Sequence, residues 1–252
     1  MDFAGRRALV TGAGSYGIGR AVARALAQAG ADVAVHHLGQ GEAASGLVAE
    51  FVGLGRRALA VEADFSDLTA ARGVVRQAVA GLGGVDILVC TAAVLLRKPA
   101  LETGDDEFAR VLGVNLQASF AVAQAAAREM VAGGWGRIVL VSSVNQFTPN
   151  PGLVAYAASK AGMMQMARVM ALELAASGVT VNLIAPGTIE TDLNRVALAE
   201  PGWRAAKLDL IPMRRIGRAE DIAAAALYLC GEGAGYVTGT TITVDGGLEL
   251  RP

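Results

Sequence analysis

The stretch RALVTGAGSYGIG, residues 7–19, joins a short apolar run to a glycine-rich turn and the start of a helical pattern. Arg7–Val10 is expected to form a buried strand, and Ile18–Ala29 the helix that follows it. Glycines in such a turn let the backbone bend tightly and approach a pyrophosphate, whose charge is met by free N–H groups at the helix start. The stretch therefore predicts a dinucleotide-binding turn; a tight loop without a ligand is the alternative.

The same alternation of apolar strand and helix continues along the chain. Further strands are expected at Asp32–His36, Ala58–Val61, Asp86–Cys90, Arg137–Val141, Thr180–Ile184 and Thr241–Val244. Further helices are expected at about Glu42–Gly53, Leu68–Ala80, Asp105–Val131, Ala155–Ala176 and Ala219–Cys230. Strands that are apolar on both faces and separated by helices indicate a parallel sheet covered on each side. We expect an α/β fold with a single Rossmann-like, doubly wound parallel sheet of about seven strands, and one domain over residues 1–252.

The composition indicates which kinds of partner and which cellular compartment to expect. The 252 residues carry 22 basic and 23 acidic side chains, which gives no electrostatic reason for binding nucleic acid or an anionic membrane. Cys90 and Cys230 lack metal-ligand spacing, no apolar run reaches the roughly 18 residues of a membrane span, and the charged start does not resemble a signal peptide. We expect a cytoplasmic protein with reduced thiols, no bound metal, and a small-molecule substrate.

A second stretch, SSVNQFTPNPGLVAYAASK at residues 142–160, carries side chains suited to proton transfer. Ser143 follows an apolar strand, and Tyr156 and Lys160 lie one turn apart on a predicted helix. An ammonium beside a phenol lowers the phenol's pKa from roughly 10, so that Tyr156 could exchange a proton with a substrate oxygen. A serine hydroxyl at the strand end could hold that oxygen. Tyrosine and lysine at this spacing also occur on ordinary solvated helix faces.

Residues after the other strands suggest where a dinucleotide would lie. His37 follows the second strand, where such folds often carry an acid that binds the adenosine ribose. With no carboxylate to repel a 2′-phosphate and no arginine to clamp one, NADP and NAD both stay open, with a slight preference for NADP. Asp64 is placed to meet the adenine edge. Asn115 lies between apolar residues of a helix, so its amide is expected to hold a water or a backbone kink, or to bond core groups.

Taken in order, these motifs resemble the short-chain dehydrogenase/reductase family over nearly the whole chain. The matching positions are Thr11, Gly12, Gly17, Ile18, Gly19, Asp64, Asn115, Ser143, Tyr156, Lys160, Pro186 to Thr191, and Val244 to Gly247. The resemblance implies that Tyr156 is the acid/base and that Lys160 lowers its pKa and bonds the nicotinamide ribose. It also implies that Ser143 orients the substrate carbonyl and that Asn115 supports a water-linked proton path. The implied cofactor-binding set is Gly12, Ser15, Tyr16, Gly17, Ile18, His37, Asp64, Phe65, Ala92, Tyr156, Lys160, Pro186, Gly187, Ile189 and Thr191.

Three positions depart from the family pattern. Four residues, Ala13 to Tyr16, separate the TG and GIG motifs where the family usually has three. The turn after the fourth strand reads Cys90-Thr91-Ala92-Ala93 instead of Asn-Asn-Ala-Gly. His37 stands where an acid is common. These departures leave open the phosphate contacts, the contacts of the turn after the fourth strand, and the cofactor preference. They do not affect Asn115, Ser143, Tyr156 or Lys160.

We predict hydride transfer between a nicotinamide and the carbon of a secondary alcohol or ketone. Hydrogen-bonding side chains near the site suggest a polyhydroxylated substrate, such as that of a sugar 1-dehydrogenase; the predicted substrate-binding residues are Ser143, Asn145, Gln146 and Glu190. The alternative is a 3-oxoacyl-[acyl-carrier-protein] reductase, with Arg214, Arg215 and Arg218 as a basic rim for a phosphopantetheine carrier. A non-catalytic dinucleotide sensor is an alternative of a different class.

Two expectations concern larger features. Residues 188–217 form a long mixed segment and are predicted to be a substrate lid; a surface excursion packed by Trp203 is the other interpretation. The resemblance implies a homo-oligomer, a tetramer or dimer. The Met-bearing helix around Met163–Met170 is consistent with a symmetric interface.

Overall fold

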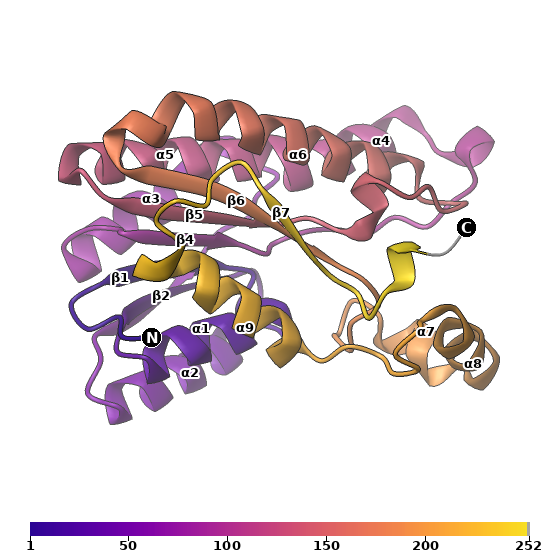
Figure 1. The fold of residues 1–252 in the computed structure, drawn as a ribbon, viewed down its shortest axis with the longest axis horizontal. Helices are drawn as coiled ribbons and strands as arrows, with labels where there is room; N and C mark the ends of the chain where they lie inside the picture. The colour runs from indigo at the N-terminus through magenta and orange to yellow at the C-terminus, as the bar shows by residue number, and fades with distance from the viewer. Residues whose placement is uncertain (251–252) are drawn as a thin grey trace.

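The structure, a computed structural model that describes residues 1–250, is built on one seven-stranded sheet (Figure 1). The strands lie in the order β3-β2-β1-β4-β5-β6-β7, and every neighbouring pair is parallel. Their bounds are β1 (Arg7–Thr11), β2 (Asp32–His37), β3 (Ala58–Glu62), β4 (Ile87–Cys90), β5 (Gly136–Val141), β6 (Val179–Pro186) and β7 (Thr241–Val244). The predicted doubly wound parallel sheet is confirmed.

Helices cover both faces of the sheet (Figure 1). On one face lie α1 (Ile18–Gln28), α2 (Gly41–Gly53) and α9 (Ala219–Cys230), and on the other α3 (Leu68–Leu82), α4 (Asp105–Leu112), α5 (Ala118–Gly133) and α6 (Val154–Leu174). Short 3-10 turns occur at Ala100–Glu102, Val144–Gln146, Ala175–Ser177, Glu232–Ala234 and Leu248–Leu250. Within the described residues, no helix combines the length and apolarity that a membrane span needs.

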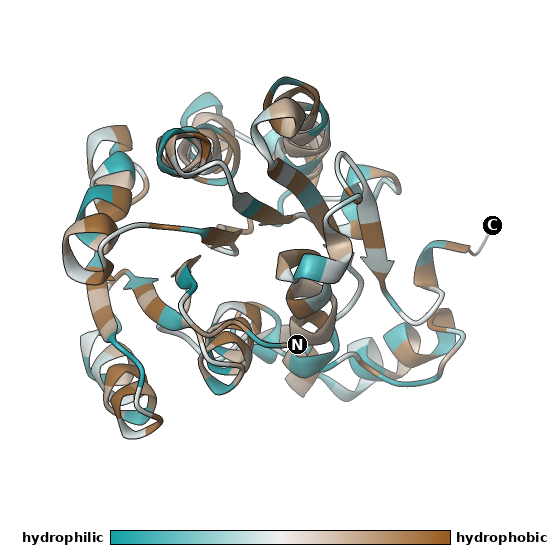
Figure 2. Ribbon diagram, turned by 60° about the vertical axis from the view of Figure 1, so that its left-hand side comes forward, coloured by the Kyte–Doolittle hydropathy of each residue, from teal (hydrophilic) through white to brown (hydrophobic). Residues whose placement is uncertain are grey.

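Two apolar cores fill the spaces between the sheet and its helices, and Figure 2 shows the hydrophobic residues concentrated on the strands and inner helix faces. In β1, Leu9 belongs to the core under α3 and α5, whereas Ala8 and Val10 belong to the core under α1 and α9. Successive side chains of a strand point to opposite faces, so both faces of each central strand are buried. This explains why the strands read as apolar throughout.

The helix expected at residues 105–131 is interrupted near the site. α4 ends at Leu112, Gly113–Gln117 forms a π-helical turn, and α5 begins at Ala118. A π turn adds a residue to the helical repeat and is often found at functional sites. The stretch expected at residues 105–131 is therefore helical as predicted, but a π turn that the sequence did not indicate divides it at Asn115.

The segment 188–217 leaves the sheet after β6 and returns to it before α9. Its ends are tied together, because the Glu190 N–H donates to the Gly217 carbonyl (2.9 Å) and the Gly217 N–H donates to the Thr188 carbonyl (3.0 Å). Between them lie α7 (Arg195–Ala199) and α8 (Pro201–Leu210). Trp203 packs against a small buried cluster of Leu198, Ile211 and Ile216. The segment thus contains two helices and carries an apolar core of its own.

Candidate functional site

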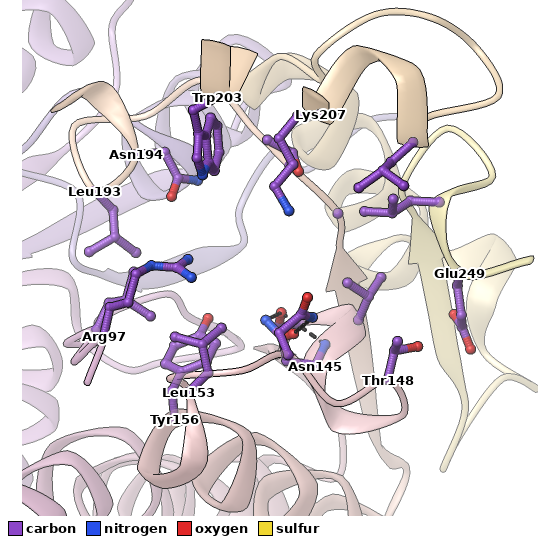
Figure 3. Close-up of a pocket in the computed structure, with 18 residues that line it drawn as sticks. Arg97, Asn145, Thr148, Leu153, Tyr156, Leu193, Asn194, Trp203, Lys207 and Glu249 are labelled. Carbon is purple, nitrogen blue, oxygen red and sulfur yellow. Dashed lines mark hydrogen bonds between the residues drawn. The ribbon is translucent and has the colours of Figure 1, made fainter. Parts of the chain in front are cut away.

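Two neighbouring hollows open at the carboxyl edge of the sheet, where ligands of open parallel sheets usually bind. The first, called here the glycine groove, has a volume of about 460 Å³. It is lined by Gly12, Ser15, Tyr16, Gly17, Ile18, Gly19, His36, Leu38, Gln40, Ala63, Asp64, Phe65, Ser66, Thr91, Ala92, Ala93, Val94, Arg110, Val114, Thr191, Asp192 and Leu193. The second, called the tyrosine cleft, has a volume of about 270 Å³ and contains Ser143 and Tyr156 (Figure 3).

The glycine turn after β1 leaves room for a diphosphate. Gly12 has φ of +68°, and a Cβ there would lie 2.9 Å from the Ala92 backbone. A Cβ on Gly19 would lie 2.5 Å from the Gly12 carbonyl oxygen. Helix α1 starts after Gly17 without a side-chain cap, so its first N–H groups remain available to an anion from the groove. These features fit a dinucleotide bound with its pyrophosphate over the start of α1.

Replacing Gly19 with alanine is expected to damage this turn. The new methyl group would contact backbone atoms that cannot move independently, so Gly19→Ala should lower the free energy of unfolding by roughly 1–3 kcal/mol and weaken dinucleotide binding. Gly46, an exposed position of α2 where an added methyl would meet no atom within 4 Å, is the matched control. Gly46→Ala should raise stability by about 0.5–1 kcal/mol and leave binding unchanged. Urea unfolding and NADP titration of both variants check this.

The extra residue of the glycine turn coincides with a contact to the segment after β6. The Tyr16 N–H donates to the Asp192 carboxylate (2.9 Å), and the Asp192 N–H donates to the Tyr16 carbonyl (3.0 Å). Thr191 and Leu193 line the glycine groove on this side. The turn is therefore linked directly to the start of the segment 188–217.

The two histidines of β2 lie on opposite faces of the sheet. His37, the predicted ribose position, is buried beneath the glycine turn, with its Cβ 2.6 Å from where a Cβ on Gly14 would lie, and it does not line the groove. His36 lines the groove instead: its Nδ1 accepts from the Gly12 N–H (3.1 Å), its Nε2 lies 3.0 Å from the Ala63 carbonyl, and its ring stacks on Phe65. Leu38 and Gln40 supply the residues beyond the end of β2 that reach the groove.

His36 should make stability fall in mild acid. Burial lowers the pKa of His36 to about 4, so the folded protein keeps this ring neutral while the unfolded chain protonates it near pH 6.5. The stabilisation is complete above pH 6.5 and is lost progressively as the pH falls from there to 4. Between pH 7 and 4.5, His36 should therefore account for about 2–3 kcal/mol of lost unfolding free energy. Urea unfolding at both pH values should show a correspondingly smaller loss in His36→Gln than in the wild type.

Most of the other predicted cofactor residues line one of the two hollows. Gly12, Ser15, Tyr16, Gly17, Ile18, Asp64, Phe65, Ala92 and Thr191 line the glycine groove. Asp64 also accepts from the Ser66 N–H (2.8 Å), and Asp67 caps α3. Gly187 lines the tyrosine cleft, Ile189 is buried beside another hollow, and Pro186 ends β6 within the sheet.

The tyrosine cleft brings the predicted reactive groups together. Ser143, just after β5, accepts hydrogen bonds from the backbone N–H and the side-chain amide of Asn145 (both 3.2 Å). Asn150 donates to the Asn145 side-chain oxygen (2.5 Å). Tyr156 lies on the first turn of α6 and lines the same cleft (Figure 3). Asparagine amides thus fix the serine hydroxyl beside the phenol.

The pKa of Tyr156 shifts in the direction opposite to the one expected from the sequence. Burial raises the pKa of the Tyr156 phenol to about 12, and only the Ser143 hydroxyl opposes this. Burial also lowers the pKa of the Lys160 ammonium to about 8. Lys160 Nζ lies 5.6 Å from the Tyr156 ring centre and donates to the Val141 carbonyl (2.9 Å). Desolvation of the phenol therefore outweighs the stabilisation that the Ser143 hydroxyl gives to the phenolate.

Asn115 connects three elements around the cleft. Its side-chain oxygen accepts from the Val94 N–H (2.8 Å), and its amide nitrogen donates to the Val94 carbonyl (3.0 Å) and the Ser159 hydroxyl (3.1 Å). Ser159 in turn donates to the Tyr156 carbonyl (2.7 Å). The π turn therefore holds the segment after β4 against the helix that carries Tyr156, and the amide is fully satisfied by protein groups.

The predicted substrate residues are only partly brought together. Ser143 and Asn145 line the tyrosine cleft, whereas Gln146 is buried behind it and Glu190 is exposed outside it. The suggested basic rim is also elsewhere: Arg214 pairs with Asp209, and Arg215 pairs with Asp221. Residues outside the predicted catalytic, cofactor and substrate sets complete the cleft, among them Leu95, Arg97, Val144, Thr148, Leu153, Thr188, Leu193, Asn194, Trp203, Lys207, Leu210, Leu248 and Glu249. Six of them come from the segment 188–217, and the predicted lid was the signal for those.

Comparison with known proteins identifies relatives that match nearly the whole chain. Residues 12–249 match the family model described as enoyl-(acyl carrier protein) reductase. The chain is 40% identical over 244 residues to Nodulation protein G of Azospirillum brasilense, covering 97% of this chain and 98% of that protein. It is 38% identical over 248 residues to an L-rhamnose 1-dehydrogenase (NAD(P)(+)) of a Sphingomonas species, covering 98% of this chain and 97% of the relative.

A solved structure is also closely similar. The gluconate 5-dehydrogenase of Burkholderia cenocepacia, in complex with NADP and tartrate, superposes with a TM-score of 0.93 at 33% identity. The match covers 100% of this chain and 98% of that one. The fold thus recurs in a protein crystallised with a nicotinamide dinucleotide.

Proposed function

This chain belongs to the short-chain dehydrogenase/reductase family, and from that premise we propose that its substrate is a polyhydroxylated small molecule such as a sugar or sugar derivative. The reaction class is that of the family: an NAD(P)-dependent oxidoreductase acting on CH–OH groups. The polar lining around Tyr156 carries the substrate proposal. Ser143, Asn145, Thr148, Asn150 and Asn194 present hydroxyl and amide groups to one cleft, which suits a molecule with several hydroxyls.

The residues of the chain have distinct parts in the reaction. A bound nicotinamide supplies or accepts the hydride. Ser143, held by Asn145, positions the substrate oxygen next to the Tyr156 phenol. Because the pKa of Tyr156 is raised to about 12, the phenol keeps its proton at neutral pH and can donate it to a developing alkoxide. In the oxidative direction the phenol must first lose that proton, and the cationic form of Lys160 would favour this.

A second candidate substrate is an acyl thioester, as the description of the matching family model suggests. The apolar residues Leu95, Leu153, Leu193 and Leu210 on the walls of the cleft favour it. Purified protein assayed with sugars and polyols plus NAD or NADP, and with a 3-oxoacyl thioester plus NADPH, separates the two. Turnover of the polyols supports our proposal, and turnover of the thioester alone contradicts it. Tight dinucleotide binding without turnover of any alcohol or ketone would favour the non-catalytic sensor.

The segment 188–217 is proposed to act as a lid over the tyrosine cleft. It contributes Trp203, Lys207 and Leu210 to the cleft, while its two ends are pinned to each other. A helical unit on a fixed base can move as one body when substrate enters.

We further propose a cytoplasmic homo-oligomer, a tetramer or dimer. Apolar side chains are exposed on α5 and α6, among them Phe120, Val131, Val169 and Leu172, the last with 83% of its surface exposed. Met163 and Met170 of α6 instead face the core. Exposed apolar side chains on adjacent helices suit an interface between copies. Size-exclusion chromatography with light scattering measures the number of subunits.

A further inference from the structure

Two cations from distant parts of the sequence point into the tyrosine cleft (Figure 3). Arg97 comes from the segment after β4, and Lys207 comes from α8 in the segment 188–217. Neither forms an ion pair with a carboxylate of residues 1–250. Glu249, which also lines the cleft, lies across it from Arg97 in Figure 3, and its carboxylate accepts from the Thr243 hydroxyl (3.2 Å). The cleft therefore holds two positive groups that form no ion pair with a carboxylate of residues 1–250.

Both side chains lie beside other residues of the cleft wall, Lys207 partly buried and Arg97 exposed. The Arg97 stem lies over Gly152: its Cγ is 3.5 Å from where a Cβ on that glycine would lie. The neighbouring Lys98 N–H donates to the Gly152 carbonyl (2.8 Å), which fixes this segment against the loop before α6. Lys207 Nζ lies 5.3 Å from the centre of the Trp203 ring, one helical turn away.

The Arg97 charge is close enough to act on the Lys207 ammonium. The pKa of Lys207 is lowered, first because the side chain is half-buried and second because the Arg97 charge is near. Two like charges converging on a partly desolvated cleft repel each other, and an anion between them would remove that cost. Arg presents a planar fork to an oxyanion and Lys presents a point charge, which together suit one carboxylate or phosphate group.

We propose that Arg97 and Lys207 bind an oxyanion substituent of the substrate, a carboxylate or a phosphate, while Tyr156 serves a CH–OH group of the same molecule. This inference rests on the proposed function and narrows it from neutral sugars to sugar acids or sugar phosphates. An aldonate has no alcohol at its first carbon, so for that class the reacting group is a secondary alcohol of the chain. A uronate still has its hemiacetal carbon.

Binding to the protein–NADP complex tests this without requiring turnover. Trp203, beside Lys207, reports occupancy through its fluorescence, and Trp203→Phe identifies the part of the signal that arises there. The probes form matched pairs in which a carboxylate replaces a CH₂OH group: D-gluconate with D-glucitol, and D-glucuronate with D-glucose. D-Glucose 6-phosphate supplies the phosphate. We expect at least one anion to bind with a Kd at least tenfold below that of its neutral counterpart, and the tighter anion identifies the oxyanion.

Charge variants test the assignment to these two residues. Arg97→Gln and Lys207→Gln should each raise the Kd of the preferred anion about ten- to hundredfold and leave that of the neutral compounds unchanged. Lys207→Arg should keep most of the affinity, Arg97→Lys should keep only part of it because a point charge replaces the planar fork, and added salt should weaken binding of the anion alone. Arg204→Gln, which removes a cation from the same helix outside the cleft, is the matched control.

The proposal is overturned if no anion binds more tightly than its neutral counterpart, or if the preference for an anion survives in Arg97→Gln and Lys207→Gln. Failure of the proposed function has a different signature. In that case sugars, sugar acids and sugar phosphates all fail to give turnover that depends on Tyr156, whatever the fluorescence titration shows.

Discussion

Tyr156→Phe is expected to lower kcat by a factor of about 10²–10⁴ while leaving dinucleotide binding unchanged. The variant removes one hydroxyl from a ring that is 8% exposed, and the ring itself still packs against Val111, Leu153 and Ala155. Only the hydroxyl proposed to exchange a proton with the substrate oxygen is lost. Steady-state kinetics with NADP and the best substrate of the sugar panel, together with NADP titration, measure the two quantities.

Tyr236→Phe provides the control for Tyr156→Phe, because Tyr236 is fully exposed and lines neither hollow. It should retain wild-type kcat. If Tyr156→Phe also retained wild-type kcat in a folded, dinucleotide-binding protein, Tyr156 would not be the proton donor.

Lys160→Met is expected to separate activity from stability. It should lower kcat by a factor of at least about 10², since the cation beside Tyr156 disappears. It should also remove the free-energy cost of burying the charged Lys160 ammonium. The pKa of Lys160 is about 8 in the folded protein and about 10.4 in an unfolded chain, so keeping the ammonium charged below pH 8 costs the fold about 3 kcal/mol. The resulting gain in the free energy of unfolding is partly offset, because the Val141 carbonyl loses its hydrogen-bond donor.

The pH dependence of unfolding distinguishes this effect. In the wild type, Lys160 makes stability rise as the pH increases from about 8 to 10.4, because the folded state releases its proton first. That contribution should vanish in Lys160→Met and persist in Lys98→Met, which replaces a partly exposed lysine paired with Glu107. Urea unfolding at pH 7.5 and 10 measures the difference. An identical rise in Lys160→Met and the wild type would show that this ammonium is not desolvated.

The sequence predicted the sheet, and it suggested the candidate reactive residues, because both depend on local patterns. Apolar strands buried on both faces are visible in the residue order, and Ser143, Tyr156 and Lys160 share one strand-to-helix connection. The direction of the Tyr156 pKa shift could not be predicted in the same way. It is decided by how deeply the phenol is buried, and burial depends on Val111 and other residues far along the chain.

The sequence also could not predict which residues of other elements reach the site. His36 and His37 are neighbours, so they point to opposite faces of the sheet. The register of β2 decides which of the two faces the groove. Arg97 and Lys207 are 110 positions apart, and only the folding of the segment 188–217 over the cleft places both in it. The π turn at Gly113–Gln117 has no distinctive composition. It is recognised only in the structure, where it directs the Asn115 side chain to the Val94 backbone.

The most direct test of the account is the transfer of a label between substrate and dinucleotide. The protein is incubated with NADP and a sugar-panel substrate that carries deuterium on the reacting carbon, and the reduced dinucleotide is analysed by mass spectrometry. Direct hydride transfer at the tyrosine cleft predicts that the deuterium moves to the nicotinamide without exchange with water, and that Tyr156→Phe forms the same labelled product far more slowly. Deuterium released to solvent, or labelled product formed at an equal rate by Tyr156→Phe, would contradict it.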